Sequence, residues 1–223
     1  QYNNGGSGAA YVLRTNDGGA TYGQVAKLTA ADAAAYDSFG YSVAIDGSTV
    51  VVGAHAKNSG RGAAYVFRTS DGGATYGQVA KLTASDAATY DTFGYSVAID
   101  GDTIVVGADD DDDGGTDSGS AYIFRTDDGG ATYGQVAKLT ASDAAAGDSF
   151  GVSVAIDGDT IVVGARFAGT GGAVYVFRTS DGGATYGQVA KLTSSDGAAD
   201  DRFGESVAID GDTVVVGAYR DDD

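Results

Sequence analysis

The chain has 223 residues, 43% of them hydrophobic, and a formal net charge of −18 that comes almost entirely from aspartate, since Glu205 is the only glutamate. A chain of this length and hydrophobicity can bury a core, whereas so acidic a surface excludes nucleic acid and anionic membranes as favoured partners. The absence of cysteine excludes disulfide bonds and thiol chemistry, and no apolar run has membrane-spanning length.

The first recognisable element is "RTNDGGATYGQVAKLT", which starts at Arg14 and returns almost unchanged at Arg68, Arg125 and Arg178. Two strands are predicted around its Gly- and Asp-rich turn, over Ala10–Thr15 and Gln24–Thr29. A second segment, "FGxSVAIDG", follows each copy and contains Phe39, Phe93, Phe150 and Phe203, which are 54, 57 and 53 residues apart. Periods near fifty residues indicate propellers, solenoids or arrays.

One complete period is predicted to hold four short strands, which in the second copy span Ala64–Thr69, Gln78–Thr83, Ser96–Asp100 and Thr103–Ala108. The Asp100-Gly101 pair predicts a two-residue hairpin with a type I′ turn. One such sheet cannot cover both of its own faces, so repeated sheets must bury one another. We therefore expect residues 1–223 to form a single all-β domain, a β-propeller of four four-stranded blades in which the terminal half-blades complete one blade.

The stretch "DTFGYSVAIDGDTIVVGA", Asp91 to Ala108, followed later by "SAYIF", resembles the FG-GAP repeat of integrin-α-type β-propellers. The resemblance implies a propeller fold and a non-enzymatic adhesion or binding module at the cell surface or outside the cell. Two departures stand out: the proline of "GAP" is missing from every copy, and a tight "IDGD" turn replaces the family's calcium loop. The integrin metal sites therefore do not carry over.

Inside the first repeated element, Thr69, Asp71, Gly73, Thr75 and Tyr76 resemble the Asp-box of sialidase-like propellers. That resemblance implies a folded hairpin rather than a catalytic site. The aspartate is expected to accept N–H bonds across the turn while the aromatic ring packs beneath it. The same structural role is expected of the copies at Asp17, Asp128 and Asp181.

Sequence differences between the copies are concentrated in the segments between the second and third strands, "HAKNSGRG", "DDDDDGGTDSGS" and "RFAGTGG". Strand order predicts that these segments lie at one end of the blades, opposite the conserved turns. Loops on a rigid scaffold commonly carry binding residues, although sequence drift without function explains the pattern equally well. The candidate contacts are His55, Arg61, Tyr90, Tyr95, Asp109, Asp113, Arg166 and Phe167.

The aspartate-rich segment has carboxylates at relative positions 1, 3, 5 and 9 and Gly114 at position 6, the spacing that wraps oxygen ligands around Ca²⁺. Its predicted metal ligands are Asp109, Asp111, Asp113 and Asp117. A divalent ion would relieve the repulsion among five consecutive aspartates, and water and salt are the alternative source of screening. The expected affinity is weak, with a Kd of about 10⁻⁴ to 10⁻³ M.

Catalytic chemistry has little support in the sequence. His55 is the sole histidine and lies in a variable segment, and Glu205 is a single carboxylate without a paired acid. The function that the sequence predicts is an extracellular, calcium-supported propeller that binds a protein or glycan and neither binds nucleic acid nor inserts into a membrane.

The alternative is a structural subunit of a surface assembly or filament. Half of a blade is predicted at each end of the chain. The halves are expected to pair within one molecule, between molecules head to tail, or with neighbouring blades of a longer tandem array.

Overall fold

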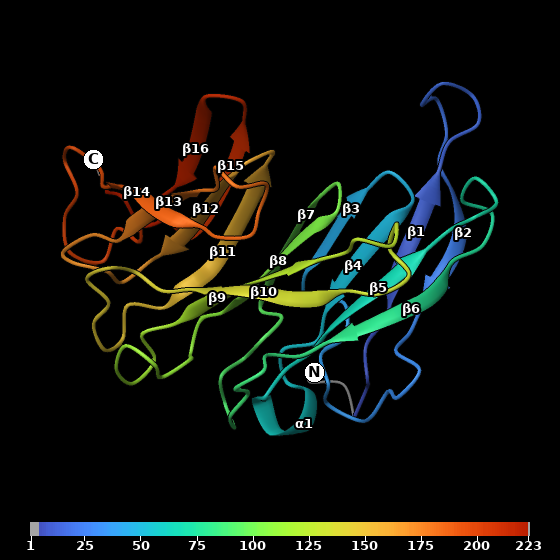
Figure 1. Ribbon diagram of the computed structural model, residues 1–223, viewed down its shortest axis with the longest axis horizontal. Helices are drawn as coiled ribbons and strands as arrows, with labels where there is room; N and C mark the ends of the chain where they lie inside the picture. Colours follow the sequence, from blue (N-terminus) through green and yellow to red (C-terminus); the bar gives the residue numbers. More distant parts are fainter. Residues whose placement is uncertain (1–4, 223) are drawn as a thin grey trace.

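The computed structural model describes residues 5–222, which form sixteen strands and one short helical turn, α1 (Lys57–Gly60), in which Asn58 and Ser59 have positive φ. The strands pair into three four-stranded and two two-stranded antiparallel sheets (Figure 1). The strands of each larger sheet follow one another in hydrogen-bonded order. The first sheet contains β3 (Val43–Asp46), β4 (Thr49–Gly53), β5 (Ala64–Arg68) and β6 (Gly77–Leu82), and the second contains β7 (Ser96–Asp100), β8 (Thr103–Ala108), β9 (Ser120–Arg125) and β10 (Gly134–Leu139). The third contains β11 (Phe150–Asp157), β12 (Thr160–Ala165), β13 (Ala173–Arg178) and β14 (Gly187–Leu192).

The two smaller sheets contain the outermost pairs of the described chain, β1 (Ala10–Arg14) with β2 (Gly23–Leu28), and β15 (Ser206–Asp210) with β16 (Thr213–Gly217). The all-β fold and the four strands expected for the second copy are confirmed, with ends that differ by at most one residue. The described helix α1 has four residues, and no described helix is long and apolar enough to cross a membrane.

The second strand of each large sheet is buried because both of its faces are covered. Every residue of β8, "TIVVGA", is buried, as expected of a continuous β-branched run in a sheet interior. The strand β10, "GQVAKL", is more exposed and alternates, as an edge strand with one wet face does.

The hairpin expected at Asp100 and Gly101 forms, but its turn differs from the predicted type. Asp100 is still paired with Thr103, so the two turn residues are Gly101 and Asp102. Only Gly101 has a positive φ, of 53°, which fits a type II′ rather than a type I′ turn. The side chain of Asp100 instead accepts a 2.6 Å hydrogen bond from the Gly158 N–H of the next sheet.

Consecutive sheets pack face to face around the phenylalanines of the "FG" segments. Phe93 is fully buried, with its ring centroid 5.4 Å from Tyr122 and 5.9 Å from Phe124. Side chains of the β3–β6 sheet, including Val51 and Val66, belong to the same apolar cluster. The equivalent Phe39 and Phe150 lie at the centres of the neighbouring clusters, so each interface repeats the same packing.

The glycine of the "FG" pair is required by backbone geometry. Gly94 has a φ of 94°, and a Cβ at this position would collide with the carbonyl oxygen of Ala63. Its N–H donates to the carbonyl of Gly107 over 2.9 Å. The chain can cross from one sheet to the next here only because no side chain is present.

The expectation that the terminal half-blades complete one blade is wrong for the single chain. The β1–β2 and β15–β16 pairs are separate sheets, and Figure 1 draws them apart, β15–β16 at the upper left and β1–β2 at the right. The physical reason is that each pair packs on its neighbour along the chain: β1–β2 shares a core with the β3–β6 sheet, and β15 lies against β11. The described chain therefore contains three complete four-stranded sheets rather than four.

Candidate functional site

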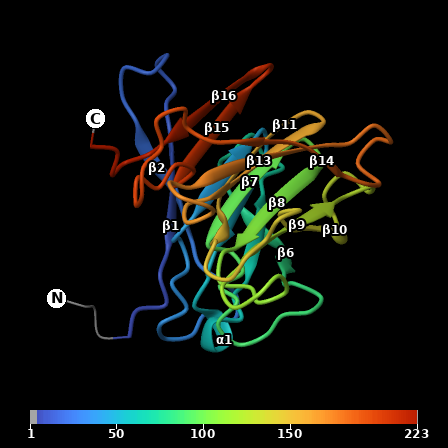
Figure 2. The same cartoon turned by 90° about the vertical axis from the view of Figure 1, so that its left-hand side faces the viewer.

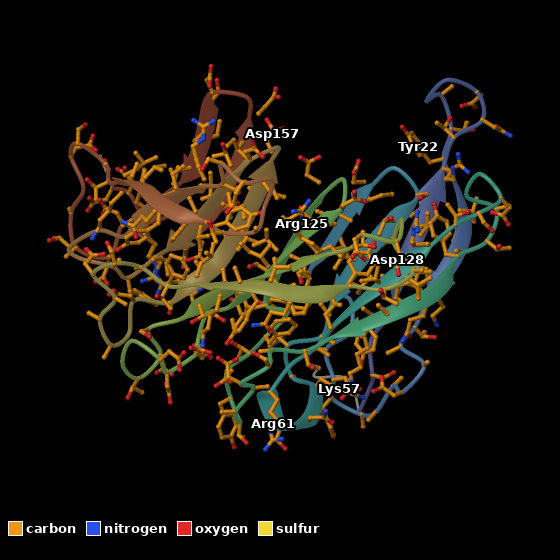
Figure 3. All side chains as sticks on the ribbon, viewed as in Figure 1. Tyr22, Lys57, Arg61, Arg125, Asp128 and Asp157 are labelled. Atoms are coloured by element: carbon orange, nitrogen blue, oxygen red, sulfur yellow. The ribbon has the colours of Figure 1, made fainter. Side chains whose placement is uncertain are left out.

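The conserved turns and the variable loops lie at opposite ends of the sheets, as expected. Lys57 and Arg61, from the β4–β5 loop, lie at one end, and Tyr22 and Asp157, from conserved hairpins, lie at the other (Figure 3). The side view in Figure 2 likewise places α1 opposite the β15–β16 turn. We call the end that carries the β4–β5, β8–β9 and β12–β13 loops the variable-loop face.

The conserved hairpins at the other end are held by local hydrogen bonds. The carboxylate of Asp71 accepts the Thr75 N–H at 2.9 Å and the Thr75 hydroxyl at 2.6 Å, and the Thr69 hydroxyl donates to it over 2.8 Å. These bonds, led by that of the Thr75 hydroxyl, hold the pKa of Asp71 well below its usual range. The same bonds recur around Asp17, Asp128 and Asp181, so these aspartates are structural.

At two positions of each repeat, the residue on the variable-loop face differs between copies. The residue after "FG" is Tyr41, Tyr95, Val152 and Glu205 in the four copies, and the residue after "VGA" is His55, Asp109, Arg166 and Tyr219. The first position lies within two residues of the start of the first strand of its sheet, and the second position lies one or two residues after the end of the neighbouring strand, so the fold places both near the line along which successive sheets meet.

Three aromatic side chains from two sheets form a cluster on this face. Tyr41 lies 4.2 Å from His55 and 4.9 Å from Tyr95 between ring centroids, and His55 lies 5.6 Å from Tyr95. Burial lowers the pKa of His55 and raises that of Tyr41. Tyr41 is still 53% exposed, so the cluster presents ring surface on which a ligand can stack.

Arg166 joins the aromatic cluster to two carboxylates. Its Nη1 lies 3.2 Å from Glu205 Oε1, its Nη2 lies 3.5 Å from Asp109 Oδ2, and its guanidinium is 6.0 Å from the Tyr95 ring centroid. The Thr92 hydroxyl donates to Asp109 Oδ1 over 2.8 Å. Burial raises the pKa of Asp109 to about 6, against the opposing effects of Thr92 and Arg166. The arginine therefore partly compensates a buried carboxylate.

The cluster contains buried polar atoms that have no hydrogen-bond partner in the described residues. They are His55 Nδ1, Arg166 Nε and Glu205 Oε2. Unpaired buried polar atoms cost free energy, so an incoming hydroxyl or amide group would gain from pairing with them if the neighbouring side chains move to expose them. The geometry favours binding over acid–base catalysis, because Arg166 lies between the two carboxylates and burial favours the neutral form of His55.

The structure brings together four of the predicted contacts, His55, Tyr95, Asp109 and Arg166, and places Phe167 beside them, with its ring centroid 5.1 Å from the Arg166 guanidinium. Arg61 and Tyr90 are exposed and do not join the cluster.

Sequence reasoning missed Tyr41, Thr92 and Glu205 as site members. For Tyr41 and Glu205 the available signal was their variation at a position where the surrounding repeat is constant.

The predicted calcium ligands do not converge on one point. Asp111 Oδ2 accepts the Tyr122 hydroxyl at 2.7 Å and pairs with Lys138 Nζ at 3.1 Å, and Asp113 pairs with the same ammonium group. Asp109 faces Arg166 instead, and Asp117 is exposed. Within residues 5–222, no three metal-ligating side chains lie close enough to hold an ion. The arrangement does not fit a calcium site unless the loop rearranges and Lys138 withdraws.

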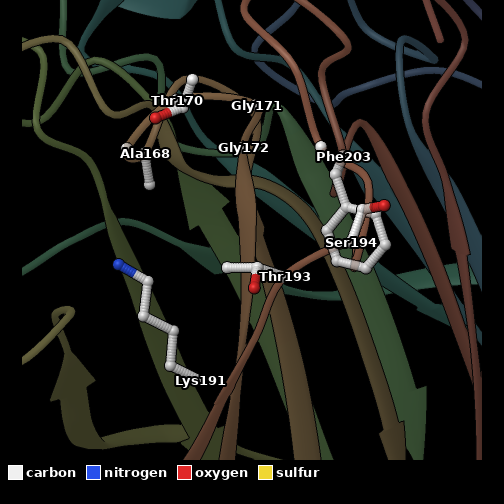
Figure 4. A pocket seen from close by; sticks show the side chains of 10 residues that line it. Ala168, Thr170, Gly171, Gly172, Lys191, Thr193, Ser194 and Phe203 are labelled. Atoms are coloured by element: carbon white, nitrogen blue, oxygen red, sulfur yellow. The ribbon is translucent and has the colours of Figure 1, made fainter.

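A separate cavity of about 220 Å³ lies beside the β12–β13 loop (Figure 4). Ala168, Thr170 and Gly172 line one side, and Lys191 and Thr193 line another. The ammonium group of Lys191 is already paired with Asp143 Oδ2 at 2.6 Å. The cavity therefore offers mostly hydroxyl and backbone groups to a small polar ligand.

Comparison with known proteins supports the repeat assignment. The family model described as FG-GAP repeat matches residues 22–67, 76–124, 133–177 and 186–223. No curated protein matches the sequence. Among solved structures, the crystal structure of the Saccharomyces cerevisiae Sqt1 is similar at 10% identity and a TM-score of 0.47. That alignment covers 74% of this chain, and this chain spans 38% of the length of the other.

Proposed function

Because the chain belongs to the FG-GAP repeat family, we propose that it is a non-enzymatic binding module whose variable-loop face holds a protein or glycan ligand. The observation that carries the proposal is the convergence of repeat-breaking side chains from separate sheets. Tyr41, His55, Tyr95, Asp109 and Arg166 meet through ring contacts and ion pairs, although up to 125 residues separate them in the sequence.

The chemistry of this cluster suits a ligand with flat or hydroxyl-bearing groups. Exposed tyrosine surface can stack on a sugar ring or an apolar side chain. The unpaired atoms of His55, Arg166 and Glu205 can pair with hydroxyl or amide groups once a ligand displaces the side chains that cover them. A propeller-like arrangement of the sheets is part of the proposal, because β3, β7, β11 and β15 follow one another as inner neighbours. An extracellular or cell-surface setting agrees with the family resemblance.

Calcium support remains a proposal for the β8–β9 loop. Asp110, Asp112 and Asp117 are among its carboxylates that make no ion pair in the described residues. Carboxylate oxygens of this loop would bind Ca²⁺, and the charge of the ion would offset that of five consecutive aspartates. This requires Asp111 and Asp113 to exchange their ion pairs with Lys138 for contacts with the ion.

The binding proposal is tested by presenting the purified chain to a glycan array and to a library of displayed peptides. Tyr95→Ala removes a stacking surface, and Arg166→Ala removes the group that links the aromatic cluster to its carboxylates. Tyr22→Ala, at the opposite end, is the matched control because Tyr22 is 65% exposed. Each site variant is expected to lower the affinity for the selected ligand by about tenfold or more, while the control variant binds with the affinity of the wild type. A ligand that is unaffected by both site variants, or lost with the control, contradicts the proposal.

A further inference from the structure

The two end faces of the row of sheets expose apolar side chains that the repeat buries elsewhere. Val43 on β3 is 61% exposed, whereas the equivalent Val97 and Val154 are 9% exposed. Together with Tyr11, Leu13 and Ile45, Val43 lines a groove of about 480 Å³. At the other end, Val215 on β16 is 64% exposed. Exposed apolar faces of this kind mark interaction surfaces.

Strand pairing inside the chain provides a template for what fits these faces. β4 and β16 have the same sequence, "TVVVG", and β5, "AYVFR", differs from β1, "AYVLR", at a single residue. β4 pairs with β5 in the register Thr49↔Arg68 to Gly53↔Ala64. β16 and β1 are each an edge strand with only one neighbour, which leaves a row of backbone groups open to pairing. The same register would join Thr213 to Arg14 and Gly217 to Ala10.

A repeated polar cluster also indicates that the strand pair β15–β16 fits the strand pair β1–β2. At each interface between sheets, a tyrosine hydroxyl and a lysine ammonium group converge on one aspartate. Tyr65 and Lys81 bind Asp32 at 2.7 and 2.6 Å, and the pattern recurs with Tyr122 and Lys138 on Asp86 and with Tyr175 and Lys191 on Asp143.

A fourth set of these residues is present but divided between the ends. Tyr11 and Lys27 have no aspartate partner within residues 5–222, where Lys27 Nζ lies 5.8 Å from the Tyr11 ring centroid. Asp196 occupies the position of Asp32 in the last repeat. Among the described residues its carboxylate has neither a tyrosine nor a lysine partner and is hydrogen-bonded to Ser194. The two ends are therefore complementary in charge at this position.

Three further contacts between sheets are divided in the same way. Arginine side chains donate to carbonyls of the next hairpin, as Arg125 does to Gly182, and this leaves Arg178 and the Gly18 carbonyl without partners in the described chain. Hairpin aspartates accept a backbone N–H from the next sheet, as Asp157 does from Gly211 over 2.5 Å. In the described chain this leaves the Asp210 carboxylate without a donor and the Gly47 N–H without an acceptor of this kind. Glutamine side-chain oxygens accept backbone N–H groups of the loops that lead into the sheets. In the described chain the Gln24 side chain lacks such a donor, and the Ser195 N–H lacks such an acceptor.

We propose that β15–β16 of one copy pairs with β1–β2 of a second copy, so that two incomplete sheets become one four-stranded sheet. Each unmatched donor or acceptor at one end then meets its counterpart from the other, and the exposed faces around Val43 and Val215 become covered. A second copy is favoured over closure within one chain because the two pairs are separate sheets that lie apart in the molecule (Figure 1).

This contact is heterologous and leads to either a closed ring or an open chain of molecules. Two copies joined at both ends would contain eight four-stranded sheets, which is within the range of closed propellers. The contact uses different residues from the variable-loop face, so either proposal can fail without the other.

The test is a charge exchange measured by sedimentation velocity between about 1 and 100 μM protein. Lys27→Asp alone places two carboxylates at the junction, and Asp196→Lys alone places two ammonium groups there. Each variant is expected to weaken association by about tenfold relative to wild type. When the two variants are mixed, every junction again pairs a lysine with an aspartate, and association is expected to recover. Asp127→Lys, an exposed change in the middle sheet, controls for the altered net charge of Asp196→Lys.

A wild-type chain that stays monomeric at the highest concentration overturns the proposal, as does a mixture that associates no better than its components. Hydrogen exchange of the β1 and β16 amides distinguishes association between copies from closure within one chain. Protected amides in a monomer would mean that the two pairs close within one chain, which also contradicts association between copies.

Discussion

Asp109 provides a direct measure of what it costs to bury a charge on the variable-loop face. Its side chain is 2% exposed, 3.5 Å from the Arg166 guanidinium and hydrogen-bonded to Thr92. Burial raises its pKa from 3.8 to about 6, because the lost hydration of the carboxylate outweighs the two favourable contacts. The folded protein therefore binds the proton of Asp109 more tightly than the unfolded chain does.

The sign and size of the effect follow from linkage. For a carboxyl group whose folded pKa lies above its unfolded value, the stabilisation is complete below pH 3.8 and is lost as the pH rises through about 6. A shift of about two pKa units corresponds to about 3 kcal/mol of unfolding free energy. Since this figure assumes a fixed structure, it is the upper end of the expected change.

The measurement compares urea unfolding of wild type and Asp109→Asn at pH 4, 5, 6 and 7, in EDTA and at constant ionic strength. Asparagine can still accept the Thr92 hydrogen bond but carries no charge. The stability of Asp109→Asn relative to wild type should rise with pH, by up to about 2.4 kcal/mol between pH 4 and 7. The attraction between charged Asp109 and Arg166 is already included in the folded pKa of about 6, so it does not change the expected rise. Asp102→Asn, at an exposed carboxylate, is the matched control for removing a charge, and a difference for Asp109→Asn that does not rise with pH would refute the reasoning.

Two further predictions concern the calcium loop and the core. Calcium at about 100 times its Kd should stabilise the chain by about 2.7 kcal/mol relative to EDTA, and thermal unfolding with Asp113→Asn as the comparison checks this; no shift in the wild type contradicts calcium binding. Phe93→Ala should lower the unfolding free energy by about 3 to 5 kcal/mol, because Phe93 is fully buried between two sheets. Urea denaturation measures that loss, and a cost below 1 kcal/mol would show that the interface is not packed as described.

The strands and the separation of conserved from variable ends were predictable because both depend on local patterns. The run "TIVVGA" has the β-branched content of a buried strand, and the Asp-Gly turns set each hairpin within a few residues. Repetition then implies that the same sheet recurs and that sheets stack. His55, Tyr95, Asp109 and Arg166 could be proposed as contacts because they interrupt an otherwise constant repeat.

By itself, the sequence determined the all-β repeat, the strand order within each sheet and the end on which individuality is concentrated. Only the tertiary structure decided that Tyr41 joins His55 and Tyr95, that Lys138 pairs with Asp111 and Asp113, and that the terminal strand pairs remain apart. These outcomes depend on how successive sheets are displaced and rotated against one another. That geometry is set by packing between sheets, which brings together residues that no local spacing relates.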